Sequence, residues 1–221
     1  MSTVMADPRS RKDYRYADDA ISAFLAEVHT PHDEALQVAF EAHERHGIPP
    51  IQVGPAEGKM LALWLKAIGA RKVVEIGTLA GYSAIWMARA LPEGGKLWTI
   101  DNDPKHAEIA RANLERAALS DRVEVCLGDG LEILDELTGE GPFCAVFIDA
   151  DKARYDRYGR WAIANLRSGG LLLGDNAYLF GQLLEDDARG AGMRRFHQEA
   201  AAALESVCAP TPDGLLIARK S

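Results

Sequence analysis

The stretch KVVEIGTLAGYSA, residues 72–84, decides the fold of this chain. Its first part, KVVEIG at 72–77, is a short apolar run of the kind that forms a strand covered on both faces. A turn with Gly77 and Gly81 follows, and glycines at such a place let a ligand approach the backbone closely. The spacing is not the G-x-G-x-x-G of dinucleotide-binding enzymes, and a lone glycine-rich turn can equally serve only to pack a strand against a helix.

The same alternation of strand and helix continues through the rest of the chain. Further apolar runs are KLWTID (96–101), RVEVCLGD (122–129), FCAVFID (143–149) and GLLLGD (170–175). Helices are expected at about 82–91, 104–118, 131–138 and 153–166, with Asp103 and Pro104 beginning the second. A last helix near 193–204 leads to SVCAP and GLLIARK, which predict a C-terminal antiparallel hairpin. The pattern predicts an α/β fold with a doubly wound, mostly parallel sheet.

Helices are also expected before the sheet begins. A first helix starts near Asp18, and Thr30 with Pro31 provides the cap and first position of a second helix that ends near Gly47. A third helix follows the Gly54-Pro55 break. We therefore expect a single domain over 1–221, with an N-terminal helical extension at 1–54 and an α/β core at 55–221.

Composition and charge limit the classes of function. With 221 residues and 48% hydrophobic content, the chain can bury one sizeable core. The net charge of -8 and pI near 5.3 argue against a broad nucleic-acid or anionic membrane interface. Three cysteines, odd in number and far apart, are typical of reduced thiols. The first residues hold no apolar signal region, and no run of about 18 apolar residues occurs, so we expect a cytoplasmic protein that acts on a small molecule.

Acidic residues stand at the predicted strand ends, where open α/β sheets bind their ligands. Asp101 ends the second strand, 24 residues after Gly77, and its carboxylate can accept both hydroxyls of a ribose. It could instead cap the next helix, but Asp103 fills that position better. An adenosine site is therefore expected at this turn. Asp129, which lies between two glycines, could meet the adenine amino group or could form only an Asx turn.

The fourth and fifth strand ends carry the most specific pattern. Asp149 ends one strand and Asp175-Asn176 end the other, so adjacent strand tips present two carboxylates and an amide to one crevice. Oxygen donors with no Cys or His nearby suit magnesium or calcium, with manganese as a further candidate, and disfavour zinc. The alternative is that both aspartates cap the following helices. Lys152 is either a base held over the crevice or a solvated surface charge.

With these residues placed, the sequence resembles the cation-dependent O-methyltransferase family that includes the caffeoyl-CoA and catechol O-methyltransferases. The resemblance covers about residues 48–220. It rests on PAEG at 55–58, VVEIGTLAGYSA at 73–84, the Asp101 strand end, VFIDADKARY at 146–155, GLLLGDN at 170–176 and DGLLIARK at 213–220. It implies a Rossmann-like class I methyltransferase fold with a seven-stranded sheet, S-adenosylmethionine as the cofactor, and a homodimer.

The family pattern also implies which residues hold each partner. The cofactor would be surrounded by Val53, Glu75, Gly77, Ser83, Asp101 and Gly130, and the strand-end analysis adds Gly81, Asp129 and Asp149. The divalent metal, magnesium before calcium or manganese, would be bound by Asp149, Asp175 and Asn176, with Lys152 as the catalytic base. The carboxylate of Glu75 is expected on the methionine or ribose side of the cofactor, where it favours the positive sulfonium.

Two departures from the family pattern fall near the acceptor. Arg154 stands where the plant enzymes usually carry Asn, and it resembles the catechol enzymes. After the Asp-Asn pair, the expected tryptophan is replaced by the stretch AYLFG at 177–181. We therefore expect a small aromatic acceptor, catechol-like or hydroxycinnamoyl-like, with Tyr178 and Phe180 as one wall of its pocket, and we do not assign caffeoyl-CoA.

Three other interpretations stay open. A tRNA hydroxyuridine O-methyltransferase would share the fold and cofactor; its support would be the basic cluster Arg9, Arg11, Lys12 and Arg15, and the acidic net charge opposes it. A nicotinamide-dependent (NAD) oxidoreductase is disfavoured by the glycine spacing. A non-catalytic cofactor sensor is disfavoured by the intact set of predicted metal ligands and base.

Overall fold

A computed structural model describes residues 19–221 and divides the chain into two compact units, Met1–His32 and Asp33–Ser221. Within the first unit, helix α1 spans Asp19–His29 and its apolar stripe, which includes Phe24 and Val28, is exposed. The expected start at Asp18 and the basic cluster Arg9, Arg11, Lys12 and Arg15 lie outside the described residues. None of the helices described is long and apolar enough to cross a membrane.

The second unit is built on a seven-stranded sheet in the order β3-β2-β1-β4-β5-β7-β6. The strands are β1 Lys72–Ile76, β2 Lys96–Asp101, β3 Val123–Leu127, β4 Phe143–Ile148, β5 Leu166–Gly174, β6 Glu205–Ala209 and β7 Leu215–Arg219. Strands β1 to β5 pair in parallel, and β7 pairs antiparallel with both β5 and β6. This confirms the mostly parallel, doubly wound sheet and the closing hairpin.

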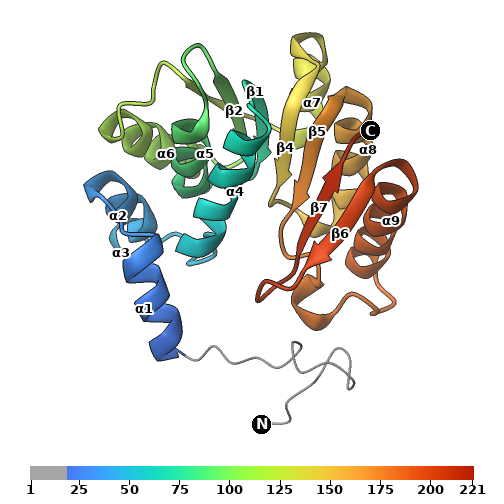
Figure 1. Cartoon of the computed structure of the whole chain (residues 1–221), viewed down its shortest axis with the longest axis horizontal. Helices are drawn as coiled ribbons and strands as arrows, with labels where there is room; N and C mark the ends of the chain where they lie inside the picture. Colours follow the sequence, from blue (N-terminus) through green and yellow to red (C-terminus); the bar gives the residue numbers. More distant parts are fainter. Residues whose placement is uncertain (1–18) are drawn as a thin grey trace. The chain divides into compact units, whose positions relative to one another are not determined.

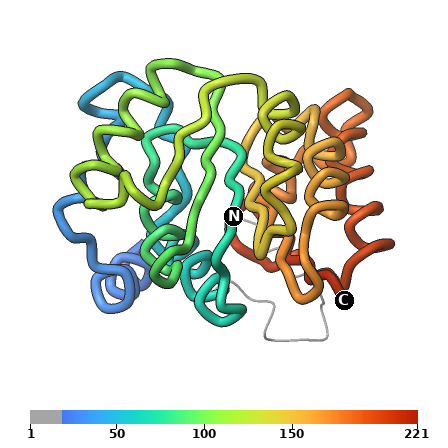
Figure 2. Tube along the Cα trace, turned by 90° about the horizontal axis from the view of Figure 1, so that it is seen from above, coloured from blue at the N-terminus to red at the C-terminus, as the bar shows by residue number. Residues whose placement is uncertain are grey.

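Helices cover the two faces of the sheet (Figures 1 and 2). On one face lie α4 Pro55–Ala67, α5 Tyr82–Ala90 and α6 Pro104–Arg116, and on the other lie α7 Gly130–Leu137, α8 Tyr155–Asn165 and α9 Ala188–Ala203. Successive strand residues alternate between two apolar cores; Val73 packs with the first set of helices and Val74 with the second. The strands therefore need apolar residues at nearly every position, which explains their unbroken apolar runs.

The second N-terminal helix begins three residues later than expected and is divided. Thr30 is not its cap, because its hydroxyl donates to the carbonyl of Ala26 (3.0 Å) at the end of α1. Asp33 is the cap and accepts from the amide of Leu36 (3.0 Å). Helix α2 spans Glu34–Phe40, and the short α3 spans Ala42–His46 before Gly47.

Asp103 caps α6 as predicted, since its carboxylate accepts from the amide of Lys105 (2.8 Å). The last helix starts earlier than the expected residue 193. Asp187 caps it and accepts from the amide of Gly190 (2.6 Å), so α9 gains a first turn that its apolar pattern does not reveal.

The ring of Phe196 on α9 fills a space made by two glycines. A Cβ added to Gly159 on α8 would lie 2.6 Å from this ring, and one added to Gly174 at the end of β5 would lie 2.8 Å from it. The close approach of α8, α9 and β5 therefore depends on the absence of side chains at both positions.

We expect Gly159→Ala to lower the free energy of unfolding by about 1 to 3 kcal/mol, because the added methyl overpacks the Phe196 contact. Urea unfolding followed by circular dichroism measures it. Gly139→Ala is the matched control, since a Cβ there meets nothing within 4 Å. Equal destabilisation of the two variants would show that the Phe196 contact does not decide the packing.

Candidate active site

A cavity of about 560 Å³ opens at the carboxyl ends of the parallel strands. The predicted site residues that line it are Val53, Gly77, Ser83, Asp101, Gly130, Asp149, Lys152 and Asn176. The other predicted residues, Glu75, Gly81, Asp129 and Asp175, are not among its lining residues. Chain segments far apart in sequence thus converge on one space, as expected for the end of a parallel sheet.

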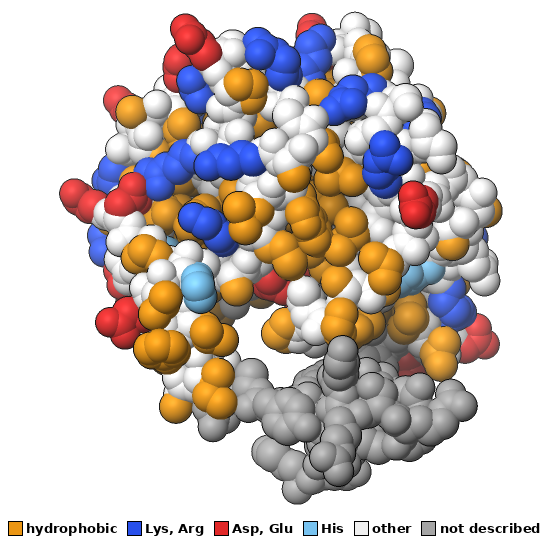
Figure 3. All heavy atoms as spheres, viewed as in Figure 1, with side chains coloured by type: hydrophobic (Ala, Val, Ile, Leu, Met, Phe, Trp, Pro, Cys, Tyr) orange, Lys and Arg blue, Asp and Glu red, His pale blue; other side chains and the backbone are white. Residues whose placement is uncertain are grey.

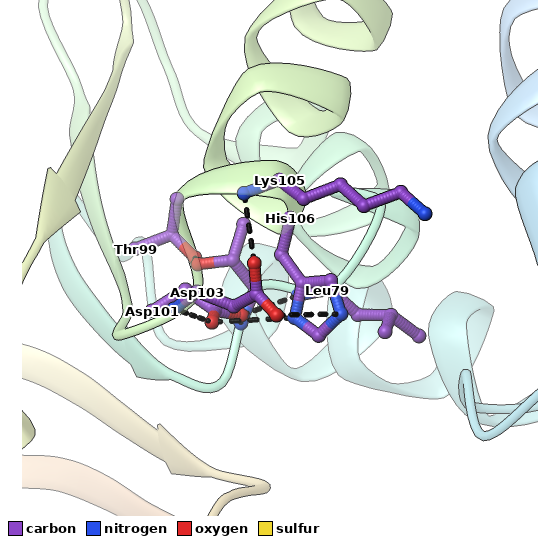
Figure 4. Close-up of polar contacts among 7 residues, drawn as sticks. Leu79, Thr99, Asp101, Asp103, Lys105 and His106 are labelled. Atoms are coloured by element: carbon purple, nitrogen blue, oxygen red, sulfur yellow. Dashed lines mark hydrogen bonds and ion pairs between the residues drawn. The ribbon is translucent and has the colours of Figure 1, made fainter. Parts of the chain in front are cut away.

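The turn after β1 holds a strained backbone against this cavity. Gly77 has a φ of 103°, and a Cβ there would lie 1.9 Å from the carbonyl oxygen of Asp149. Leu79 has a φ of 48°, which is rare for a residue with a side chain. This conformation directs the amides of Thr78 (3.2 Å) and Leu79 (2.9 Å) at one carboxylate oxygen of Asp101 (Figure 4). The turn and the end of β2 therefore form one rigid unit.

Glu75 lies in the core beneath this turn and is fully buried. Its carboxylate accepts from the hydroxyls of Ser83 and Thr99, the latter at 2.6 Å. Burial raises the pKa of Glu75 to about 8, and the charges of Asp149 and Asp101 add to that rise. Glu75 is not a lining residue and Ser83 is, so Glu75 is connected to the cavity through the hydroxyl of Ser83.

Two other predicted residues have structural contacts. Gly81 is the N-cap of α5 with a φ of 79°, and a Cβ there would lie 3.4 Å from Ala110. Asp129 caps α7 through the amide of Leu131 (2.9 Å) and pairs with the guanidinium of Arg154 (2.6 Å), which holds the pKa of this carboxyl below its usual range. The Asx-type contact considered for Asp129 is therefore present.

Lys152 points its amine at the end of β4. The amine donates to Asp149 (2.9 Å) and to the hydroxyl of Tyr155 (2.8 Å). The same hydroxyl lies 3.0 Å from the carbonyl oxygens of Ile148 and Asp175, so the buried tyrosine ties the ends of β4 and β5 to the lysine. Lys152 is partly buried and paired, which excludes a freely solvated charge. Asp149 is also not the helix cap, because Asp151 caps the following turn.

Asp175 and Asn176 follow β5, where Asn176 lines the cavity and Asp175 is buried beside it. Burial, together with the charges of Asp149 and Glu57, raises the pKa of Asp175 to about 7. No Lys, Arg or His among the described residues forms an ion pair with Asp175. The amide of Asn176 donates to Asp175 (3.3 Å) and to Asp213 (3.2 Å). Within residues 19–221, Asp175 is therefore a buried carboxylate beside like charges with no ion-pair partner, and the more distant charge of Lys152 only partly opposes the rise of its pKa.

This donor set fits a hard divalent cation, because such an ion would neutralise the unpaired charge of Asp175 beside Asp149. Within residues 19–221 there is no group of three His, Cys, Asp or Glu side chains that could hold a metal ion. The predicted set therefore depends on the amide of Asn176 as its third ligand.

Sequence reasoning missed several residues of this site. Asp213 was assigned only to the hairpin turn, yet it contacts Asn176 and lines the cavity. Tyr155 belongs to the VFIDADKARY motif at 146–155, but its contact with Lys152 and the roles of both Tyr155 and His106 depend on contacts that the sequence does not show. Of the two expected wall residues, Phe180 lines the cavity, whereas Tyr178 packs over Gly214, where a Cβ would lie 2.6 Å from its ring.

We expect the stability of the ligand-free protein to fall as pH rises from about 5 to 8, in part because of Glu75. Its folded pKa of about 8 lies above the unfolded value of 4.5, so folding keeps a proton that the unfolded chain has released. Glu75→Gln should remove this loss, on the order of 3 kcal/mol at pH 8. Urea unfolding across that range measures it, with the exposed Glu108→Gln as the control; parallel curves for wild type and Glu75→Gln would contradict the burial argument.

Comparison with known proteins identifies the class of this site. The model of the O-methyltransferase family matches residues 26–221. A catechol O-methyltransferase of Mycobacterium tuberculosis is 45% identical over 177 residues, covering 79% of this chain and 80% of the relative. A catechol O-methyltransferase of Niastella koreensis is 40% identical over 184 residues, covering 81% and 83%.

A solved structure gives the same result. The O-methyltransferase from Bacillus cereus in complex with SAH matches with a TM-score of 0.87 at 37% identity, covering 91% of this chain and 97% of that one. The sheet order, the cavity at its carboxyl end and these similarities agree. The chain belongs to the O-methyltransferase family and is an O-methyltransferase that uses S-adenosylmethionine.

Proposed function

We propose that the protein transfers the methyl group of S-adenosylmethionine to a hydroxyl of a small aromatic acceptor, catechol-like or hydroxycinnamoyl-like, and that a divalent metal is required. The observation that carries this proposal is the cavity itself, which joins Asp101 at one end to Asp149 and Asn176 at the other. The two relatives named catechol O-methyltransferase support an acceptor of this class.

The cofactor would occupy the part of the cavity along β1 and β2. Asp101 would accept a ribose hydroxyl, and the backbone around Gly77 would allow the ligand to lie against the turn. Val53, Ser83 and Gly130 would enclose the rest, and Glu75 in its ionised form would favour the cationic sulfonium. Gly81 and Asp129 would affect cofactor binding indirectly, because they hold the backbone at the starts of α5 and α7 in place.

The metal, magnesium or alternatively calcium or manganese, would be held by Asp149, Asp175 and Asn176. When bound, it lowers the pKa of the acceptor hydroxyl and neutralises the developing negative charge. Asp149 and Asp175 would supply the two negative charges, and the burial of Asp175 limits the screening of its charge by water. The buried hydroxyl of Tyr155 keeps Lys152 beside them.

The reaction is an in-line displacement at the methyl carbon. The acceptor oxygen forms the new C–O bond as the S–C bond breaks, and the electron pair of that bond goes to sulfur. Lys152, acting in its neutral amine form, takes the hydroxyl proton. Loss of the methyl group removes the positive charge from the cofactor, which favours release of the product.

An apolar rim supports an aromatic acceptor. Phe180 is 56% exposed and Ile51 is 67% exposed, and both line the cavity. Large apolar side chains at the mouth of a cavity are stabilised when an apolar ligand covers them. The tRNA alternative lacks a comparable observation, because its basic cluster lies outside the described residues.

Chelation with excess EDTA should abolish methyl transfer from labelled cofactor to a catechol, and added magnesium should restore it. Asp175→Ala should lower metal affinity and activity at least about tenfold, since it removes one of two balancing charges. Its affinity for S-adenosylhomocysteine, measured by calorimetry, is the control and should stay close to wild type. Full activity in EDTA, or in Asp175→Ala, would refute a role for the metal.

Lys152→Ala is the complementary variant. It should lower kcat by about 100-fold or more with little effect on metal affinity, and partial recovery at higher pH is expected for the loss of a base. Lys59→Ala, which changes a lysine that does not line the cavity, is the control. An unchanged kcat in Lys152→Ala would assign the proton transfer to another group.

We also propose that the protein is a homodimer and that it works in the cytoplasm. Hydrophobic side chains gather on the face of the sheet over β5, β7 and β6 (Figure 3), where a groove is lined by Trp64, Ile68, Leu171, Val207 and Ile217. An exposed apolar surface of this kind supports self-association. The three cysteines are free thiols, which supports a reducing compartment.

Light scattering at micromolar concentration should give twice the chain mass of 24.1 kDa. Val207→Lys, which places a charge in the groove, should shift the protein toward the monomer. Leu127→Lys, at the opposite edge of the sheet on β3, is the control and should leave the mass unchanged. A monomeric wild type would contradict the proposal.

A further inference from the structure

The carboxylate of Asp101 is saturated with hydrogen-bond donors. One oxygen accepts from the amides of Thr78 (3.2 Å) and Leu79 (2.9 Å), and the other from the amide of Asp103 (2.9 Å) and from Nδ1 of His106 (3.3 Å). An ionised carboxylate has about four lone-pair positions, so these four contacts use them all. A ribose hydroxyl can bind Asp101 only if one donor leaves.

Only one of the four donors is free to leave. The amides of Thr78 and Leu79 belong to the strained turn after β1, and the amide of Asp103 lies at the cap of α6. His106 instead reaches Asp101 by a side chain from the first turn of α6, and its ring lines the cavity (Figure 4). A change of rotamer moves an imidazole, whereas moving the amides would require a rearranged backbone.

We propose that His106 occupies the position on Asp101 that a ribose hydroxyl of the cofactor takes, and that the imidazole gives up this contact when the cofactor binds. The inference rests on the proposed cofactor site. It makes His106 a positioning residue that fixes the rotamer of Asp101 and competes with the ligand for it.

The charges around His106 give this competition a pH dependence. Asp101 lies 3.3 Å from Nδ1 and Asp103 lies 3.8 Å from Nε2, while the turn after β1 contributes the apolar Leu79. The side chain of Lys105, the neighbour of His106 on α6, extends away from Asp101 in Figure 4. Histidine changes charge between pH 5 and 8, and the imidazolium pairs with both carboxylates. Low pH therefore strengthens the contact that the cofactor must break, and binding should release a proton.

The test is calorimetry of S-adenosylhomocysteine binding at pH 6 and pH 8, in two buffers of different ionisation enthalpy to count protons. In wild type the Kd should be about three- to tenfold higher at pH 6 than at pH 8, in addition to any change that His106→Ala also shows. Near pH 6.5, binding to wild type should release up to one proton more than binding to His106→Ala. Glu75 titrates in both proteins, so its contribution cancels in the comparison.

Two further variants make the result decisive. His106→Gln keeps a neutral side chain of similar reach and should lose the extra proton as His106→Ala does, while the exposed His46→Ala should behave as wild type. Identical pH dependence and proton counts in wild type and His106→Ala would overturn the inference. So would a tenfold loss of affinity in His106→Ala at pH 8, because His106 would then be a direct ligand. If wild type binds no S-adenosylhomocysteine at any pH, the proposed cofactor site itself fails.

Discussion

The close approach between Gly77 and the carbonyl of Asp149 is the constraint on which the site depends. A Cβ at residue 77 would lie 1.9 Å from that oxygen, so no other residue allows β1 and β4 to end side by side in this way. The contact joins the turn that faces Asp101 to the strand end that carries Asp149. The side of the cavity with Asp101 and the side with Asp149 are therefore held by one backbone arrangement. Transfer of a methyl group requires such a fixed alignment of donor and acceptor.

Convergence of parallel strand ends also concentrates negative charge. Burial raises the pKa of Glu75 to about 8 and that of Asp175 to about 7, and the charge of Asp149 adds to both rises. Lys152 balances only part of this charge through Asp149. The sulfonium of the cofactor and a divalent cation would balance the remaining negative charge. The electrostatic cost of gathering these carboxylates would therefore favour the binding of positive partners.

The sequence predicts well what depends on local pattern. The β1 to β5 runs, the cap at Asp103 and the closing hairpin follow from periodicity and turn chemistry, and each is present. Contacts between distant segments could not be predicted: Asp129 meets Arg154, and Asp213 meets Asn176 across the hairpin. The predicted start of α2 is wrong because Thr30-Pro31 matches the pattern of a cap and first helical residue, and only the fold shows that the Thr30 hydroxyl bonds to the carbonyl of Ala26 in α1.

The stretch that departs from the family pattern is strained, as is the turn after β1. Asn176, Leu179 and Phe180 have φ values of 51°, 50° and 54°, and such conformations cost about 1 to 3 kcal/mol each in residues with side chains. Burial of Leu179 and the bonds from the amides of Ala177 and Tyr178 to the hairpin at 213–214 hold the backbone in place. The strain keeps Phe180 turned outward at the rim of the cavity. The hairpin at 213–214 fixes this stretch, and the turn after β1 does not. Substitutions within the stretch can therefore change the acceptor wall while the cofactor end of the cavity keeps its geometry.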